Sequence, residues 1–316
     1  MIFANKVRIF ASVLALSTGL SAGLPAAAVV GDSSTATKRI ALKTDAPCIG
    51  WTRADDAEPK AVILCLHELG LHSGSFEDMG KKMAQRGFVS YAIDLRGFGQ
   101  WAQNRSKESQ MNLDNTFKDT VAALKAIQKA HPGVPIFVLG EAMGGAMALK
   151  VAQNHPELVA GAISSAPGGE HFKQGKLDMS VGSRLLTSAN KKYPYGKDFI
   201  SMGTAKPATR ESFEKDSMVR LELTPRECMQ CQFFMFSSKG MAKKIKNTPV
   251  MIVQGQLDKM AKPYGATNVY NRLSTKERKL YMVPDGDHYV YEDPNIPESV
   301  IATTVDWMSQ YLGKRN

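Results

Sequence analysis

Several signatures are absent from this 316-residue chain, and their absence narrows its function. It contains no internal repeat and no long low-complexity tract. The formal net charge is +10, yet no helix-turn-helix, RNA-recognition or zinc-finger spacing accompanies the basic residues, so we expect no nucleic-acid partner. The C-x-x-C motif from Cys228 to Cys231 lacks the second pair of ligands that a zinc site needs. We therefore expect no metal and no other cofactor.

Cysteine is scarce, with four residues in different contexts. Cys65 lies in a continuous apolar run and is expected to be a small buried hydrophobe, and Cys48 begins the preceding predicted strand. Cys228 and Cys231 do not open a helix after a strand, as thioredoxin-type redox cysteines would. In an oxidising compartment we favour a local disulfide between them, with free thiols as the alternative.

The N-terminus is typical of an export signal. Lys6 and Arg8 precede an apolar run from Ile9 to Leu24, and residues 26–28 form an A-x-A cleavage site. The apolar run is short for a membrane span, so we favour cleavage of residues 1–28 over an uncleaved anchor, and a periplasmic or secreted protein. No cysteine supports a lipoprotein anchor at this site. Cleavage would leave 288 residues, 29–316, which suit one large α/β domain with an inserted cap.

The hydrophobic pattern predicts alternating strands and helices. Strands are predicted near residues 38–44, 48–53, 61–67, 89–94, 136–140, 160–166, 249–255 and 279–284, and helices near 76–86, 115–130, 143–154, 262–273 and 297–312. Continuous apolar strands such as 61–66 predict a mostly parallel sheet covered by helices on both faces. The alternation stops between Pro167 and Asn247, which marks an inserted segment.

The turn around Ala142 has the features of a nucleophile elbow without a nucleophile. In the G-x-S-x-G pattern, a strand ends in a sharp turn whose apex carries the attacking side chain before a helix begins. Here residues 136–139 are the expected strand and residues 146–152 the expected helix, with Gly140, Gly144 and Gly145 where the turn needs them. Ala142 stands at the apex and has a methyl group with no lone pair.

Two further strand ends carry a candidate acid and a candidate base. Asp258 follows the apolar strand 249–255, and His288 follows the strand 279–283. Residues just past the carboxyl ends of parallel strands lie where open α/β sheets place their sites. The order apex, acid, histidine is that of the α/β-hydrolases. Asp94, Asp285 and Asp287 compete for the acid role, and we favour Asp258 because it follows a long apolar strand.

Together with a His-Glu-Leu-Gly loop at residues 67–70 and the run D-L-R-G-F-G at residues 94–99, these segments resemble the monoacylglycerol lipase and lysophospholipase (serine aminopeptidase-like) branch of the α/β-hydrolases. The resemblance runs from about residue 38 to the C-terminus and implies an eight-stranded, mostly parallel sheet with a cap at about residues 168–248. It implies Ala142 at the nucleophile position, Asp258 as the acid and His288 as the base. Leu69 and Met143 would supply the oxyanion N–H groups.

The chain departs from this family at three positions. Ala142 replaces serine, Phe98 replaces the second histidine of D-x-R-G-H-G, and Glu68 stands where the family has glycine. A charge on Glu68 would oppose a developing oxyanion if the side chain pointed inward, and we expect it to point outward. His67 is expected to be structural beneath the loop, and no chemistry is expected of the loop residue His72.

The inserted segment carries most of the positive charge. Residues 168–248 contain 15 basic and 8 acidic residues, a net charge of +7, together with eight aromatic residues and six methionines. Basic groups interleaved with soft apolar ones suit an anionic membrane surface or an amphiphilic substrate. The alternative is an ordinary cap with an apolar inner face and a solvated outer face.

Three functions fit these observations. The first is an exported hydrolase of lipid-like or small carboxylic esters whose Ser-His-Asp triad is inactivated by Ala142. The second is a pseudohydrolase that keeps the pocket to bind an acyl ligand, lipid or protein without catalysis. The third is a structural exported protein without a ligand, and the retained acid and histidine argue against it.

Overall fold

The computed structural model describes residues 36–103, 109–171 and 175–313. The predicted export signal, residues 1–28, lies outside them. The structure contains an eight-stranded sheet in the order β1-β2-β4-β3-β5-β6-β7-β8. The strands are β1 (Thr37–Ile40), β2 (Cys48–Arg53), β3 (Val62–Leu66), β4 (Val89–Ile93), β5 (Ile136–Glu141), β6 (Gly161–Ser165), β7 (Val250–Gly255) and β8 (Arg278–Val283).

The sheet is parallel except at β2, which pairs in antiparallel fashion with β1 and β4. Its central strands β3, β4, β5 and β6 are buried at every position, as strands covered on both faces must be. This confirms the predicted fold class. All eight strands fall where the hydrophobic pattern predicts them, although β1 ends at Ile40, four residues before the predicted boundary.

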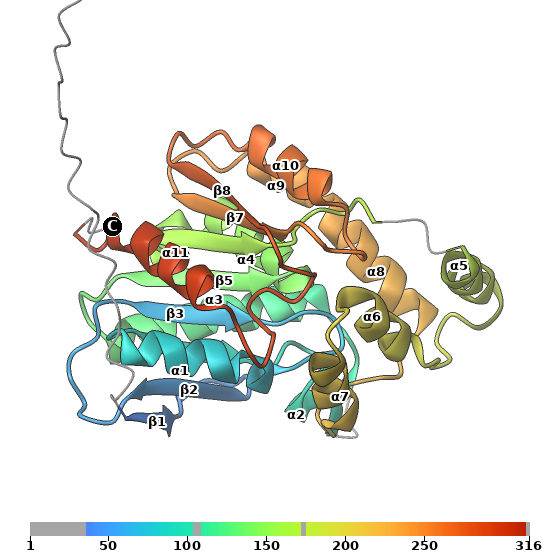
Figure 1. The fold of residues 1–316 in the computed structure, drawn as a ribbon, viewed down its shortest axis with the longest axis horizontal. Coiled ribbons are helices and arrows are strands. Elements are labelled where there is room, and N and C mark those ends of the chain that lie inside the picture. The colour runs from blue at the N-terminus through green and yellow to red at the C-terminus, as the bar shows by residue number, and fades with distance from the viewer. Residues whose placement is uncertain (1–35, 104–108, 172–174, 314–316) are drawn as a thin grey trace, which may run out of the picture.

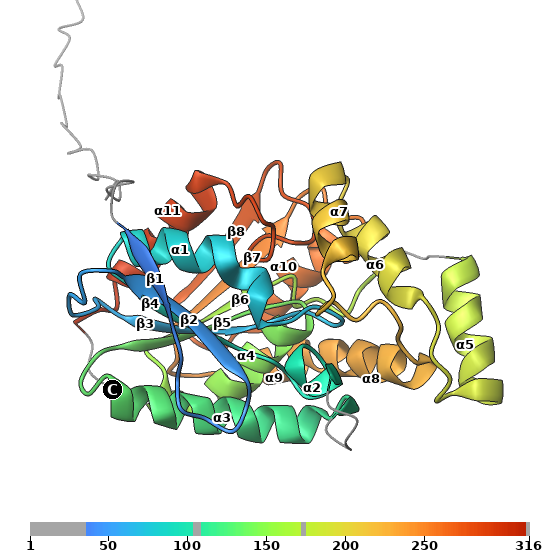
Figure 2. The same cartoon turned by 90° about the horizontal axis from the view of Figure 1, so that it is seen from below.

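Helices cover both faces of the sheet. α1 (Glu77–Gln85) and α11 (Glu298–Ser309) lie on one face, and α3 (Leu113–Ala130) and α4 (Met143–Asn154) lie on the other (Figure 2). A short helix α2 (Gln100–Gln103) follows β4, and α10 (Pro263–Arg272) connects β7 to β8. Among the described residues, no helix is long and apolar enough to cross a membrane.

The segment between β6 and β7 folds into five helices within the described residues. These are α5 (Lys176–Ser188), α6 (Tyr195–Gly203), α7 (Pro207–Lys215), α8 (Pro225–Phe236) and α9 (Ser238–Ala242). Figure 1 shows α5 to α8 beyond the carboxyl ends of the parallel strands, where the predicted site residues also lie. We refer to residues 168–248 as the cap.

Three polar contacts fix the cap to the loops that follow β3 and β4. The ring of His72 contacts the Asp216 carboxylate at 2.8 Å through Nε2, while its Nδ1 accepts the Gly74 N–H. The backbone N–H of Arg220 donates to the Gly70 carbonyl at 2.7 Å, and its guanidinium donates to the Gly97 carbonyl. His72 therefore holds the cap against the scaffold, a role that its sequence context did not indicate.

Candidate active site

The elbow is built as a nucleophile elbow around a residue that cannot attack. Ala142 adopts φ 45° and ψ −104°, outside the regions that an L-residue prefers. The neighbouring glycines are required by close backbone approach. A Cβ on Gly140 would lie 2.1 Å from the Gly144 carbonyl oxygen, and one on Gly144 would lie 1.9 Å from the Leu66 carbonyl oxygen. The turn is therefore strained at Ala142 and closely packed at both glycines, as a sharp turn between a strand and a helix requires.

The predicted acid and base are in direct contact. The Nδ1 atom of His288 lies 2.7 Å from Asp258 Oδ2, and both residues are buried. The Asp258 carboxylate also accepts the backbone N–H groups of Met260 and Ala261 at 2.7 and 2.8 Å and the side-chain amide of Gln254 at 2.8 Å. These three donors fix the carboxylate in an orientation that meets the imidazole.

The competing aspartates have other partners. Asp94 accepts the backbone N–H groups of Ser73 and Gln100, and the Asp287 carboxylate accepts the hydroxyl of Thr204. Asp285 is exposed. Among the four candidate aspartates, Asp258 is thus the one whose carboxylate contacts the His288 ring.

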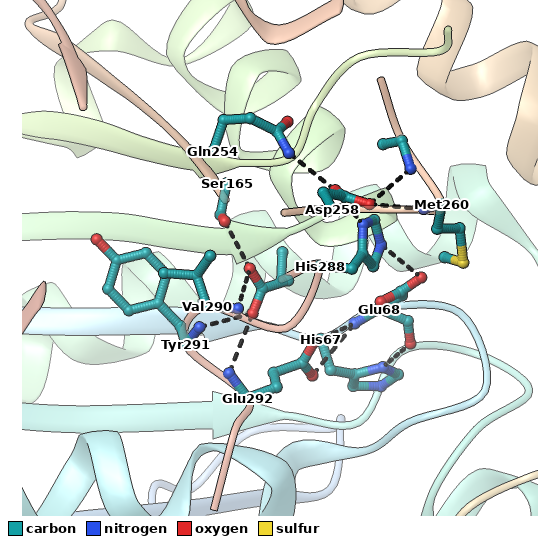
Figure 3. Close-up of polar contacts among 12 residues, drawn as sticks. His67, Glu68, Ser165, Gln254, Asp258, Met260, His288, Val290, Tyr291 and Glu292 are labelled. Atoms are coloured by element: carbon teal, nitrogen blue, oxygen red, sulfur yellow. Dashed lines mark hydrogen bonds and ion pairs between the residues drawn. The ribbon is translucent and has the colours of Figure 1, made fainter. Parts of the chain in front are cut away.

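The expectation that Glu68 points outward is wrong. Its side chain is 4% exposed, and its Oε1 atom lies 3.1 Å from Nε2 of His288 (Figure 3). The orientation of the Glu68 side chain follows from charge. Nδ1 of His288 already donates to Asp258, and a second carboxylate beside Nε2 favours protonation of that nitrogen too. Both ring nitrogens of His288 then donate, one to each carboxylate.

Electrostatics favour the charged form of this ring. Burial alone would lower the pKa of His288, but the carboxylates of Asp258 and Glu68 outweigh burial and raise the pKa well above its ordinary value. The two carboxylates therefore favour the imidazolium form of the ring. An imidazolium has no free lone pair, so His288 cannot act as a general base in this state.

Two buried glutamates connect the histidine loop to its neighbours: Glu141 connects it to the elbow, and Glu292 connects it to the loop after β3. The carboxylate of Glu141, directly before Ala142, accepts the backbone N–H groups of Val290, Tyr291 and Glu292 at 2.8–3.1 Å. Burial raises the pKa of Glu141 to about 7. The Glu292 carboxylate accepts the Glu68 N–H at 3.2 Å. Burial and the nearby carboxylates of Glu141 and Glu68 raise the pKa of Glu292 well above its ordinary value.

The loop histidine His67 is structural. Its Nδ1–H donates to the Glu68 carbonyl at 2.7 Å, and its Nε2 accepts the Leu95 N–H at 2.9 Å. Burial lowers the pKa of His67 to about 4, so the ring is neutral. Phe98 packs edge-on against this ring at 5.7 Å, so the phenylalanine that replaces the family's histidine belongs to the packing beneath the loop.

Met143 and Leu69 are the two residues predicted to supply the oxyanion N–H groups. Met143 is the first residue of α4, so its N–H has no carbonyl partner within the helix. Leu69 follows Glu68 and lines the pocket described below. Their role in holding an oxyanion stays a prediction.

An apolar pocket lies between the cap and the site. Its volume is about 510 Å³, within the range of small-molecule sites. Glu68 and His288 line it together with residues of α5, α6 and α8. Its apolar walls include Val181, Phe199, Met202, Met229, Met235 and Phe236. Many of the cap's aromatic and methionine side chains thus face an internal pocket.

The cysteines of the C-x-x-C motif also line this pocket, and they form no disulfide. Cys228 and Cys231 lie on α8 and are both free thiols, so the favoured disulfide is wrong. Burial raises the pKa of Cys228 to about 12 and the pKa of Cys231 well above its ordinary value. Buried, protonated thiols act as small apolar groups here. Among the described residues, no group of three or more His, Cys, Asp or Glu could hold a metal ion.

Gln254 is the site residue that sequence reasoning missed. It is the penultimate residue of β7, is fully buried, and donates to Asp258. The sequence did contain a signal for this role: Gln254 stands in an otherwise apolar strand, four residues before Asp258. Buried polar side chains are nearly always hydrogen-bonded, so a partner for Gln254 was to be expected nearby.

Comparison with known proteins identifies the family and agrees with the fold. The serine aminopeptidase S33 family matches residues 57–295. Human monoglyceride lipase is 24% identical over 256 residues, covering 80% of this chain and 83% of that protein. The monoacylglycerol lipase of Mycolicibacterium smegmatis is 20% identical and covers 83% of this chain and 92% of that protein.

Solved structures share the fold. A soluble variant of the Saccharomyces cerevisiae monoglyceride lipase, bound to a substrate analogue, superposes with a TM-score of 0.71 at 20% identity, covering 88% of this chain and 98% of that one. The monoacylglycerol lipase of Paleococcus ferrophilus gives a TM-score of 0.67 at 18% identity and covers 88% and 99% of the two chains. The chain belongs to the serine aminopeptidase S33 family of α/β-hydrolases, on the branch that includes the monoglyceride lipases.

Proposed function

We propose that this protein is a non-catalytic member of its family that binds a lipid-like amphiphile in the cap pocket. One observation carries the proposal. The Nε2 atom of His288, which faces the nucleophile in a working triad, is bonded to Glu68, and residue 142 is alanine. The site therefore lacks both an attacking atom and a base that could activate one.

The steps of a working Ser-His-Asp triad show which functions this site lacks. There, the residue at position 142 attacks the ester carbonyl while His288 accepts its proton and later gives it to the leaving alcohol. Asp258 holds the ring, and the N–H groups of Leu69 and Met143 stabilise the oxyanion. In this chain Ala142 has no proton to give. Glu68 keeps His288 protonated and places negative charge beside the oxyanion loop.

The ligand class rests on the pocket and on the relatives. The walls are aliphatic, aromatic and thioether side chains, and they enclose enough volume for an alkyl chain. The relatives named above are lipases of monoglycerides, so a single-chain lipid is the ligand that family membership favours. Binding without turnover is the function that remains when the pocket is kept and the nucleophile is lost.

A second candidate is a carboxylic-ester hydrolase disabled at one position. The intact bond between His288 and Asp258 favours it, because a site free of selection for catalysis has no need to keep this pair. The two candidates differ in what a serine at position 142 would do. It would restore hydrolysis in a singly disabled enzyme but not in a site that Glu68 also blocks.

We also propose that the protein is exported and that its cap meets anionic membrane surfaces. Export is supported by the basic, apolar and A-x-A segments of residues 1–28, and surface binding by the net charge of +7 on the cap. Fractionation of cells that express the full chain tests export: a shorter form in the exported fraction supports it, and a full-length cytosolic form contradicts it.

Binding and turnover can be measured on one sample. The protein is incubated with 1-dodecanoylglycerol, binding is followed by calorimetry, and the lipid is recovered for mass spectrometry. We expect saturable binding and intact lipid. Met202→Trp, which fills part of the pocket, should weaken binding, whereas Met218→Trp makes the same exchange away from the pocket and should not. Hydrolysis that disappears in His288→Ala would overturn the proposal.

A further inference from the structure

The buried carboxylate of Glu68 has one oxygen without a partner. Oε1 contacts His288, whereas Oε2 is buried and has no hydrogen-bond partner in the part of the chain that the structure describes. The residue is 4% exposed and lines the cap pocket. A buried carboxylate oxygen without a hydrogen bond raises the free energy of the folded protein, because it has lost its contacts with water. A ligand that donates a hydrogen bond to Oε2 would therefore bind more favourably.

The pocket offers this oxygen no protein cation other than His288. Its acidic lining residues are Glu68 and Asp178, and its lining contains no lysine or arginine. The other titratable side chains of the lining are His171, His288, Cys228 and Cys231. With His288 as imidazolium, the group of Glu68, His288 and Asp258 has a net charge of −1. Burial raises the pKa of Glu141, and burial together with the carboxylates of Glu141 and Glu68 raises the pKa of Glu292, so further negative charge is disfavoured here.

We propose that the cap pocket selects amphiphiles with a protonated primary amine as head group, whose N–H groups donate to Oε2 of Glu68 while the alkyl chain lies along the apolar walls. The proposal rests on the function proposed above and names the ligand class of the same site. An ammonium group supplies both the donor and the positive charge that the site lacks. A hydroxyl supplies a donor only, and a carboxylate adds a third negative group beside Glu68 and Asp258.

The outside of the cap would favour the opposite ligand. Its net charge of +7 attracts anionic amphiphiles and repels cationic ones through long-range electrostatics. Non-specific association with the protein therefore predicts tighter binding of a carboxylate than of an amine. Preference for the amine would be a property of the pocket, since it runs against the charge of the surface.

Three ligands that differ only in head group test the proposal. Decylamine, decanol and decanoate are titrated into the full chain by calorimetry near neutral pH. We expect decylamine to bind about tenfold more tightly than decanol, the factor that a charged hydrogen bond typically provides, and decanoate to bind most weakly. Equal affinities, or tighter binding of decanoate, would overturn it.

Two variants locate the effect. Glu68→Gln removes the charge at constant size and should weaken decylamine about tenfold while changing decanol less than about twofold. Asp178→Asn removes the other carboxylate that lines the pocket and is the matched control, expected to change decylamine affinity little. An equal loss in Asp178→Asn would assign the preference to general electrostatics and overturn the role of Glu68.

The outcomes separate this inference from the proposed function. If Glu68→Gln does not fold, as judged by its thermal transition, the comparison of three ligands on the unaltered chain still decides the head group. If decanol and decanoate bind as tightly as decylamine, the pocket is a lipid site and the inference fails. If none of the three binds at millimolar concentration, both the inference and the proposed function fail.

Discussion

Nε2 of His288 lies 3.1 Å from Oε1 of Glu68, on the side of the ring opposite the Asp258 contact. The imidazole is therefore held by a carboxylate at each nitrogen. Under the proposed function, Ala142 removes the attacking group and the Glu68 contact removes the base. Reversing only one of these two changes should then not restore catalysis.

The first prediction follows from this pairing. Ala142→Ser alone should leave hydrolysis of short acyl esters at least about 100-fold below that of the double variant Ala142→Ser, Glu68→Gly, because only the double variant has both nucleophile and base. Hydrolysis of p-nitrophenyl butyrate measures both. Adding His288→Ala to the double variant should abolish the recovered activity. Equal activity of the single and double variants would show that Glu68 does not block the site.

The second prediction concerns the charge of His288. We expect its ring to remain doubly protonated well above the ordinary histidine pKa of about 6.5, because the carboxylates of Asp258 and Glu68 outweigh burial. Glu68→Gln removes one of these charges, so the pKa of His288 should fall. Nitrogen NMR of the histidine side chains measures the titration in both proteins. An unchanged pKa in Glu68→Gln would contradict the ion pair.

The same shift has a consequence for stability. A raised folded-state pKa stabilises the protein fully below about pH 6.5, and this contribution is lost as the pH rises through the folded-state value. The difference in free energy of unfolding between the unaltered chain and Glu68→Gln should therefore be larger near pH 6 than near pH 9. Urea unfolding at the two pH values tests the sign, and a difference that grows with pH would contradict it.

Local sequence patterns predicted the scaffold and placed Asp258 and His288 at the same end of the parallel strands. A continuous apolar run such as β3 can bury all its side chains only as a strand of a sheet that is covered on both faces. Asp258 and His288 follow strands at the carboxyl ends, where sites of α/β sheets form. The direction of the Glu68 side chain was not predictable in this way. It depends on a histidine 220 residues away along the chain, and the rotamer is decided by an interaction that exists only after folding.

The cysteines show the same limit. C-x-x-C spacing is compatible with a disulfide in a loop, but Cys228 and Cys231 lie on a regular helix that begins with a capping box between Thr224 and Glu227. Spacing alone does not show that the segment is helical.

A third prediction therefore concerns thiol chemistry. Burial raises the pKa of Cys228 to about 12, and Cys231 is also shifted upward, so the reactive thiolate form is scarce in the folded protein. Ellman's reagent near pH 8 should react with neither until the protein is unfolded. Alkylation of unfolded, unreduced protein should then add four groups, one for each cysteine. Two missing groups would indicate a disulfide.

A fourth prediction compares two glycines in helices. A Cβ on Gly144 would lie 1.9 Å from the Leu66 carbonyl oxygen, which belongs to the backbone of a central strand and cannot move aside. Gly144→Ala should lower the free energy of unfolding by more than about 3 kcal/mol. Gly182 lies inside α5 with open space at its Cβ position, so Gly182→Ala should raise it by about 0.5–1 kcal/mol. Thermal unfolding of both variants measures the contrast. Similar changes in the free energy of unfolding of the two variants would show that α4 and β3 can move apart to accept a Cβ at position 144.

The last prediction concerns the outer surface of the cap. α5 and α8 both line the pocket, and each exposes large apolar side chains, with Met179 71% and Phe233 64% exposed. Exposed lysines such as Lys176 and Lys192 lie on α5 or just after it. Apolar groups beside basic ones suit insertion into an anionic lipid surface, where each basic residue contributes about 1 kcal/mol.

The protein should therefore float with vesicles that contain phosphatidylglycerol more than with neutral vesicles, and added salt should weaken the binding because it screens the charges. Replacing Met179 and Phe233 with serine should reduce binding. Lys243, Lys244 and Lys246 are also exposed, but they precede β7, at the edge of the sheet opposite the pocket. Their replacement by glutamine should therefore reduce binding less than the two serine substitutions. Equal binding to both vesicle types, unchanged by salt, would show that the exposed apolar groups of the cap do not serve a membrane.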